Sequence, residues 1–307
     1  MRLDIAGQTD VGRRKNKNED SYGVVREGAP GLRLFREGAL LCVADGLGGH
    51  VGGEIASKLA VSMMRDVAKE TLPPPPEDDA EVDERDEGPL PLMRAALEKA
   101  NESIYQTNQD IVTEGRPMGT TVLAALILPG KTYIANVGDS RCYHVRDGEM
   151  IARTVDHSWV DEQVKQGLMS KAEAALDRRK NVVTRCVGTH ADISVDTYCW
   201  HIVPGDILLL CTDGLVNMAT DQEILEVINK QGTAADFAQR LVHLANENGG
   251  KDNITVLLAN ISPGLFRLIY LRSRTLLRKY GFTLGWALFL ILYGVGAFAL
   301  GWFLRGA

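Results

Sequence analysis

The chain has 307 residues, of which 45% are hydrophobic and 24% are charged, and its formal net charge is −6. This is the balance of an ordinary globular protein, and the acidic charge gives no reason to expect nucleic-acid binding. The length suits one large domain with additions. The cysteines lie mostly in apolar stretches without metal-ligand spacing, which favours reduced thiols in a cytoplasmic domain. These are Cys42, Cys142, Cys186, Cys199 and Cys211.

The N-terminal part predicts two strands joined by a charged loop. Residues 3–9 and 21–25 have the pattern of strands. Between them, residues 9–20 carry a group of basic residues followed by acidic ones, which suits a polar loop that holds an anion beside a metal. An apolar run at residues 39–44 then ends at Asp45, and glycines follow, as expected for a buried strand that delivers a carboxylate to its end.

Two amphipathic helices are predicted next, at residues 53–71 and 92–112, with a different kind of segment between them. Residues 72–91 contain four consecutive prolines and an acidic run, so they cannot bury a core and are interpreted as a disordered surface insertion. The first helix is expected to place one face against the core. That face consists of Ile55, Leu59, Met63 and Val67.

The rest of the chain alternates groups of strands with helices. We predict strands at residues 120–128, 131–137, 141–145, 181–187, 206–211 and 254–259. Helices are predicted at 158–176, 220–229 and 234–248, the second of them capped by Thr220. Strands grouped in meanders, with paired long helices between them, favour an α+β sandwich over a parallel sheet.

Carboxylates recur at the ends of predicted strands. Asp139 and Asp213 follow apolar runs as Asp45 does, and Asp252 precedes one. The glycines after Asp45 let the backbone approach a ligand closely, so the Gly46 carbonyl is a further candidate. These are hard oxygen ligands without a competing Cys/His cluster, which favours Mg²⁺ or Mn²⁺ over Zn²⁺. A single aspartate of this kind is commonly only a turn or a helix cap.

Together with residues 12–20, 118–121 and 183–188, these stretches resemble the metal-dependent serine/threonine protein phosphatases of type 2C (the PPM family), in their bacterial form. The resemblance covers about residues 3–260, with every motif in the family's order. It implies a four-layer α/β/β/α sandwich, in which two antiparallel sheets pack face to face and helices lie outside. The catalytic domain would be residues 1–262, with a flap at about residues 157–185.

The resemblance also implies a set of metal ligands. Asp45 would bridge two Mn²⁺ or Mg²⁺ ions, Asp213 and Asp252 would hold the first, the Gly46 carbonyl the second, and Asp139 with Asp213 a weaker third. Two metals ~3.5–4 Å apart can bind phosphoryl oxygens, generate hydroxide from a shared water and orient its in-line attack. Behind these ligands, Glu19 and Asp20 would hold metal-bound waters, and Asn253 would support Asp252.

Two roles in the site stay open. The family has a phosphate-binding arginine five residues before the position of Asp20, and this chain has Lys15 there. Lysine supplies a point charge where arginine supplies a bidentate fork, so either Lys15 binds the phosphate or Arg14 or Arg13 takes its place. His50 is a candidate general acid for the leaving serine or threonine oxygen, or it only holds the glycine-rich loop.

The C-terminal residues predict a membrane anchor. Residues 282–304 carry no charge. The run is long enough to cross a ~30 Å hydrocarbon core as a helix. Tyr280, Trp286 and Trp302 lie near its ends, as interfacial aromatics do. The basic segment 263–281 precedes it and a single arginine follows. The positive-inside rule therefore places the catalytic domain in the cytoplasm, at what would be a bacterial inner membrane.

The sequence thus predicts a membrane-anchored phosphatase that acts on phosphoserine and phosphothreonine of proteins modified by a serine/threonine kinase. The alternative is a pseudophosphatase that binds phosphoproteins with little or no turnover. All four metal-binding aspartates are present, which argues against the alternative. Lys15 is the only departure in its favour.

Overall fold

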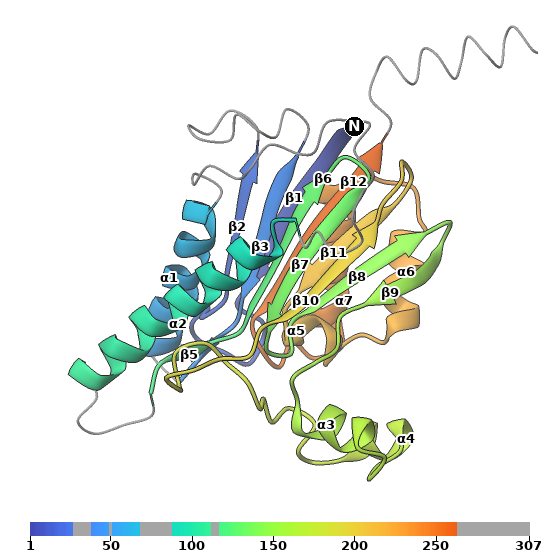
Figure 1. The fold of residues 1–307 in the computed structure, drawn as a ribbon. Helices are drawn as coiled ribbons and strands as arrows, with labels where there is room; N and C mark the ends of the chain where they lie inside the picture. Colours follow the sequence, from blue (N-terminus) through green and yellow to red (C-terminus); the bar gives the residue numbers. More distant parts are fainter. Residues whose placement is uncertain (27–37, 49–50, 68–87, 112–116, 263–307) are drawn as a thin grey trace, which may run out of the picture. The chain divides into compact units, whose positions relative to one another are not determined.

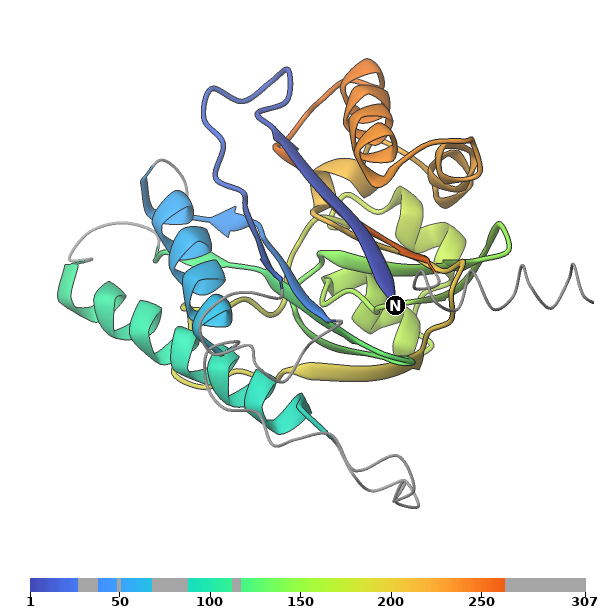
Figure 2. The ribbon, with the colours of Figure 1, turned by 90° about the horizontal axis from the view of Figure 1, so that it is seen from above.

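The computed structural model of the chain describes residues 1–26, 38–48, 51–67, 88–111 and 117–262. Two antiparallel sheets pack face to face, and helices cover their outer faces (Figures 1 and 2). Leu3–Ser262 belong to one unit. The predicted α/β/β/α arrangement is therefore confirmed.

Each large sheet has five strands, and a short pair lies apart from them. The first sheet has the order β1 (Arg2–Asp10), β12 (Ile254–Ser262), β11 (Ile207–Cys211), β8 (Arg141–Arg146) and β9 (Glu149–Arg153). The second has the order β10 (Asp196–His201), β7 (Lys131–Val137), β6 (Val122–Leu128), β3 (Ala39–Ala44) and β2 (Ser21–Arg26). The short pair consists of β4 (Gly46–Leu47) and β5 (Gly119–Thr120).

The helices divide into three groups. Figure 2 shows α1 (Val51–Val67) and α2 (Leu90–Ile111) outside one sheet, and α6 (Asp221–Ile228) and α7 (Ala234–Glu247) outside the other. Beyond one end of the sheets lie α3 (Trp159–Lys165) and α4 (Lys171–Leu176), on the side where β5 and α5 (Asp213–Val216) also lie (Figure 1). The flap therefore adjoins the end of the sandwich at which Asp213 starts α5.

Strand β3 shows why its sequence is apolar without alternation. Leu40 and Cys42 pack in the cluster beneath α1 and α2, whereas Leu41 and Val43 pack in the cluster between the sheets. Successive side chains of a strand point to opposite faces, so a strand between two packed layers has to be apolar on both. Truncating the fully buried Leu41 to alanine would cost about 2–5 kcal/mol.

Several predicted elements need correction. Residues 181–187 form no strand, because only the isolated bridges Ser158↔Val183 and Thr120↔Val187 occur there. The predicted strand 120–128 is divided into β5 and β6, because the N–H of Thr121 donates to the carbonyl of Asp45 at 2.8 Å. The strands β9 and β10 were not predicted.

The helix boundaries and the packing face also differ in places. Ile55 is 48% exposed, and the smaller Ala56 and Ala60 are fully buried in its place, so α1 can lie closely on the sheet. Leu90 and Pro91, assigned to the insertion, belong to the first turn of α2, where proline is tolerated.

Within the part of the chain that the structure describes, no helix combines the length and the apolar character needed to cross a membrane. Three predicted segments lie wholly or mostly outside the described residues. These are the insertion 72–91, the basic segment 263–281 and the span 282–304.

Candidate active site

The fold brings the predicted aspartates to one place. Asp45 follows β3, Asp139 follows β7, and Asp213 follows β11 as the first residue of α5. Asp252 lies just before β12. Burial raises the pKa of Asp45 well above the ordinary range, and the negative charges of neighbouring aspartates raise it further. These neighbours are Asp20, Asp213, Asp139 and Asp252.

This cluster of carboxylates is electrostatically unfavourable as it stands. Burial and the charges of neighbouring aspartates raise the pKa of Asp213 to about 6 and that of Asp20 to about 7. Burial and the charge of Asp213 also raise the pKa of Asp139 well above its ordinary value. Like charges and a low-dielectric surrounding both disfavour the ionised form. A cation placed among these groups would reverse the effect.

Unsatisfied oxygen atoms point to the same need. The Oδ1 atoms of Asp20, Asp139 and Asp213 and Oε1 of Glu19 are buried without a hydrogen-bond partner in the described part of the chain. Buried polar atoms in native proteins nearly always have a partner, so each such atom requires an explanation. A divalent cation or its hydration water supplies one.

The donor chemistry fits a hard ion that keeps part of its hydration shell. No group of three or more His, Cys, Asp and Glu side chains among the described residues is arranged to hold a metal by itself. Mg²⁺ in proteins characteristically binds through one or two carboxylates and retains several waters. The oxygen atoms available here therefore fit Mg²⁺ or Mn²⁺, held through carboxylates and water.

Lys15 lies at this cluster, on the loop between β1 and β2. Its Nζ is 2.6 Å from Oδ1 of Asp252, and the Lys15 side chain is 42% exposed. Burial opposes its charge, but the hydrogen bond to Asp252 and the charges of Asp252, Asp45 and Glu19 raise the pKa of Lys15. The predicted phosphate-binding position therefore lies beside a predicted metal ligand and is open to solvent.

The other candidates for phosphate binding and acid catalysis stand differently. Arg14 is exposed, and its backbone N–H donates to the carbonyl of Gly250 at 3.1 Å. Arg13 donates from Nε to the carbonyl of Asn246 at 2.8 Å, which directs its side chain toward the end of α7. His50 lies outside the described residues, so both of its predicted roles remain predictions.

Asn253, predicted only to support Asp252, also holds the loop between β1 and β2. Its Nδ2 donates to the carbonyls of Val11 at 2.9 Å and Lys17 at 2.8 Å, and its Oδ1 accepts from the N–H of Glu19 at 2.8 Å. Its backbone N–H also donates to Asp252 Oδ1 at 2.8 Å, and its predicted support of Asp252 as a metal ligand stays a prediction. One side chain thus fixes the loop that carries Lys15 and Glu19.

Threonine hydroxyls and a glycine fix the backbone at Asp45 and the carboxylate of Asp20. Oγ1 of Thr121 accepts from the N–H of Asp45 at 3.0 Å, and Oγ1 of Thr212 donates to Oδ2 of Asp20 at 2.8 Å. At Gly46 a Cβ atom would collide with the carbonyl oxygen of Gly53. Only glycine lets these backbone segments meet. The role of the Gly46 carbonyl as a ligand stays a prediction.

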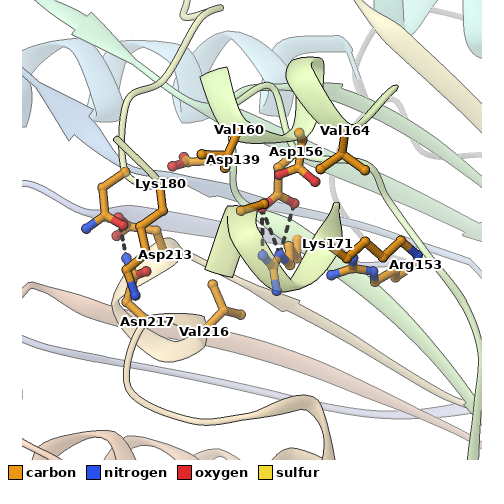
Figure 3. Close-up of a pocket in the computed structure, with 14 residues that line it drawn as sticks. Asp139, Arg153, Asp156, Val160, Val164, Lys171, Lys180, Asp213, Val216 and Asn217 are labelled. Carbon is orange, nitrogen blue, oxygen red and sulfur yellow. Dashed lines mark hydrogen bonds and ion pairs between the residues drawn. The ribbon is translucent and has the colours of Figure 1, made fainter. Parts of the chain in front are cut away.

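A pocket of about 280 Å³ extends from Asp139 and Asp213 under the flap, and Figure 3 shows the residues that line it. The flap is attached to the Asp139 loop through His157. Nδ1 of His157 accepts from the N–H of Gly138 at 3.0 Å, and the N–H of His157 donates to the Gly138 carbonyl at 3.0 Å. The pocket and the carboxylate cluster therefore form one continuous site.

Comparison with known proteins gives consistent results. The family model described as protein phosphatase 2C matches residues 13–259. The "Serine/threonine phosphatase stp" of Listeria monocytogenes is 35% identical over 254 residues, covering 82% of this chain and 93% of that protein. The S. agalactiae serine/threonine phosphatase structure has a TM-score of 0.73 and 34% identity, covering 85% of this chain and 100% of that one. The PstP catalytic domain in complex with two manganese ions has a TM-score of 0.66 and 30% identity, covering 85% and 99%.

Proposed function

Because the chain belongs to the protein phosphatase 2C family and is a metal-dependent protein serine/threonine phosphatase, we propose that its strand-end aspartates hold the Mn²⁺ or Mg²⁺ used in the reaction. Held there, the ions would supply an activated water for the hydrolysis of phosphoserine and phosphothreonine. The unpaired buried oxygens of Asp20, Asp139 and Asp213 are the observation that carries this proposal. They leave acceptor positions open in a site where proteins otherwise fill them.

Each residue of the cluster has a task in this proposal. Asp45, Asp213 and Asp252 hold the two main ions together with the Gly46 carbonyl, and Asp139 contributes to a weaker third site. Glu19 and Asp20 accept hydrogen bonds from the waters around the ions. When bound, Mn²⁺ or Mg²⁺ supplies a Lewis acid that lowers the pKa of water and neutralises charge on the phosphoryl oxygens.

Lys15 is proposed to bind the substrate phosphate. Its ammonium lies 2.6 Å from Asp252, and its partial exposure leaves it accessible to a phosphoryl oxygen that arrives from solvent. A lysine acts as a point charge and does not impose the planar geometry of an arginine fork. Asn253 holds the Lys15 loop by donating to the carbonyl of Lys17. Gly12 lets this loop approach Asp252 closely, because a Cβ atom there would collide with the Asp252 carbonyl and the φ of Gly12 is 78°.

The test is phosphate release from a phosphothreonine peptide by the full chain, with Mn²⁺, with Mg²⁺ and with EDTA. We expect turnover with either metal and none with EDTA. Calorimetric titration of Mn²⁺ into the metal-free protein is a second measurement, independent of turnover. Phosphopeptide binding without turnover in any metal would contradict the proposal and support a pseudophosphatase.

We also propose that residues 282–304 anchor the enzyme in a membrane, with the catalytic domain in the cytoplasm. The support comes from the sequence, because the uncharged run is preceded by five basic residues between positions 267 and 279. The anchor would place the phosphatase near membrane-bound kinases and their substrates. A protein truncated after residue 262 should lose its association with membranes in fractionation. A truncated protein that still sediments with them would refute the anchor.

A further inference from the structure

The pocket under the flap has a charge that the metal site does not explain. Among its lining residues are the cations Arg153, Lys171 and Lys180, which come from β9, the start of α4 and the turn after α4. In the view of Figure 3, Lys180 is drawn on the side of Asp213 and Asn217, and Lys171 on the side of Arg153. Cationic groups therefore lie both beside the predicted metal ligand Asp213 and on the other side of the pocket.

The two lysines are available for a ligand. Neither ammonium has a hydrogen bond or an ion pair with another described residue, and both side chains are exposed on the rim of the pocket. Arg153 makes a long ion pair of 4.0 Å with Asp221, and its charge also acts on Asp156. In contrast, Arg141 is neutralised within the pocket by Asp156, with Nη2 to Oδ2 at 2.7 Å.

The acidic lining residues do not cancel this charge. Asp139 and Asp213 are predicted metal ligands, and Asp156 is paired with Arg141. The remaining acid, Asp161, accepts from the hydroxyl of Ser158 at 2.7 Å in the first turn of α3. With metals bound, the part of the pocket beyond Asp213 therefore has a net positive charge and attracts an anion.

Contacts of Arg179 and Trp159 hold the backbone of the turn that carries Lys180 in place. The guanidinium of Arg179 lies 3.5 Å from the centroid of the Trp159 ring, and its Nη2 lies 3.0 Å from Oδ2 of Asp177. The N–H of Trp159 donates to the carbonyl of Val182 at 2.8 Å. These contacts join the start of α3 to the turn after α4, so Lys180 is presented from a defined backbone position. A preorganised cation binds an anion with less loss of entropy.

We propose that this pocket selects substrates by binding a second anionic side chain, one that lies close in the sequence to the phosphorylated residue being hydrolysed. Lys171 and Lys180 would be its principal contacts, with Val160 and Val216 forming apolar walls. Aspartate, glutamate and a second phosphorylated residue share this chemistry. The proposal rests on the proposed phosphatase function, because it assigns the neighbouring subsite of the same active site.

The first experiment compares a neutral phosphothreonine peptide with peptides that carry one aspartate, one second phosphothreonine or one lysine, moved through the positions on either side of the target residue. The full-length protein with Mn²⁺ is used, and kcat and KM are measured separately. At one or more positions, we expect KM to be about three- to tenfold lower for the anionic peptides than for the neutral one, with kcat little changed. Comparing the aspartate and the phosphothreonine peptides shows which anion is preferred.

Charge reversal gives the sharper test. The variant with Lys171→Glu and Lys180→Glu should lose the preference for anionic peptides and gain one for the lysine peptide, which a folding defect cannot produce. Hydrolysis of p-nitrophenyl phosphate, which carries no neighbouring residue, should change far less than the preference among peptides. Lys165→Glu is the matched control, since Lys165 is exposed on α3 and does not line the pocket.

Binding of a hydrolysis-resistant phosphonate peptide, followed by fluorescence anisotropy, separates this inference from the proposed function. If no peptide is hydrolysed in any metal but acidic phosphonates bind through the lysines, the catalytic proposal fails and the pocket remains. If peptides are hydrolysed without regard to neighbouring charge, or if the reversed variant keeps the natural preference, the pocket proposal is wrong.

Discussion

Strand β11 has an aspartate near each end, and the two differ in their hydrogen-bond partners and in the direction of their pKa shifts. Asp206, just before the strand, is fully buried, and its carboxylate accepts from Nε2 of His144 and Nε of Arg146, each at 2.7 Å. Asp213, just after the strand, accepts from Nδ2 of Asn217 at 2.9 Å but keeps its buried Oδ1 unpaired.

The pKa values follow the same division. Burial alone would raise the pKa of Asp206, but hydrogen bonds from Arg146, the N–H of Val203 and His144 lower it below the ordinary value. For Asp213, burial and the charge of Asp252 raise the pKa to about 6. A buried aspartate whose partners come from the chain stabilises the fold. One whose partners are missing destabilises the fold until a cation binds.

The largest effect expected from this difference is on catalysis. Asp213→Asn should lower metal-dependent phosphate release on the order of a thousandfold, because a ligand to the ions is lost. The same variant should be at least as stable as the natural protein without metal, since the ionised Asp213 is repelled by its neighbours. Urea unfolding in EDTA measures the second quantity. If Asp213→Asn keeps its activity, Asp213 is not a metal ligand.

At the other end of β11 the expected effect is on stability. Asp206→Asn should lower the free energy of unfolding by about 3 kcal/mol, because His144 and Arg146 lose a buried charged partner. The kcat of the folded protein should change little. Asp192→Asn serves as the control, because Asp192 is exposed. An unchanged urea midpoint in Asp206→Asn would show that the cluster around Asp206 does not stabilise the fold.

The pH dependence of the folding stability should also differ between the carboxylate cluster and Asp206. The folded-state pKa values of about 7 for Asp20 and about 6 for Asp213 exceed the unfolded value of 3.8, so their stabilising contribution is complete below about pH 4 and is lost as pH rises through 6 to 7. The lowered pKa of Asp206 acts in the opposite direction, and its contribution is lost as pH falls below about 4.

In EDTA, the Tm should therefore rise as the pH is lowered from about 8 to about 5. Saturating Mn²⁺ should raise the Tm at the higher pH and flatten this dependence, because the ions replace protons as partners of the carboxylates. Differential scanning fluorimetry measures both series. A metal-free protein that is most stable at about pH 8 would contradict the repulsion inferred for the carboxylate cluster.

The smallest effect concerns Lys15, the cation that pairs with Asp252. Lys15→Ala should raise the KM for a phosphothreonine peptide about tenfold, because a partly exposed charged contact to the phosphate is lost. Lys15→Arg should restore binding, and the exposed neighbour Lys17→Ala should leave KM unchanged. If Lys15→Ala changes only kcat, Lys15 acts through the metal ligands and does not bind the phosphate.

The sequence predicted that Asp45, Asp139, Asp213 and Asp252 lie at the ends of strands, because each adjoins a strongly apolar run. The apolar pattern alone does not distinguish Asp206 from Asp213, since both flank the same apolar run, and the family resemblance was needed to select Asp213. The difference comes from strand register, because β11 pairs with β8 so that Leu208 lies opposite His144. Long-range pairing of this kind is not encoded in local pattern.

The missed elements have related causes. Strand β10 lies at the edge of its sheet and is only partly buried, so it lacks an apolar run. The segment 181–187 has β-branched residues, but its backbone makes only isolated bridges, from Val183 to Ser158 and from Val187 to Thr120. The role of Asn253 depends on contacts with residues more than 230 positions away, such as Val11 and Lys17. The local pattern could not reveal these contacts, and the family resemblance indicated only the place of Asn253 beside Asp252.

The attachment of the Lys15 loop to the segment before β12 also has a consequence for biosynthesis. Strand β1 pairs with β12, and the amide groups of Arg13 and Arg14 donate to the Gly250 carbonyl. The first and last parts of the catalytic region must therefore meet before the site exists, which gives the fold a high contact order and slow closure. A nascent chain on the ribosome has Asp45 and Lys15 long before it has Asp252 and Asn253. We expect phosphatase activity to appear abruptly, only after the last strand leaves the exit tunnel, and stalled chains of increasing length would show this.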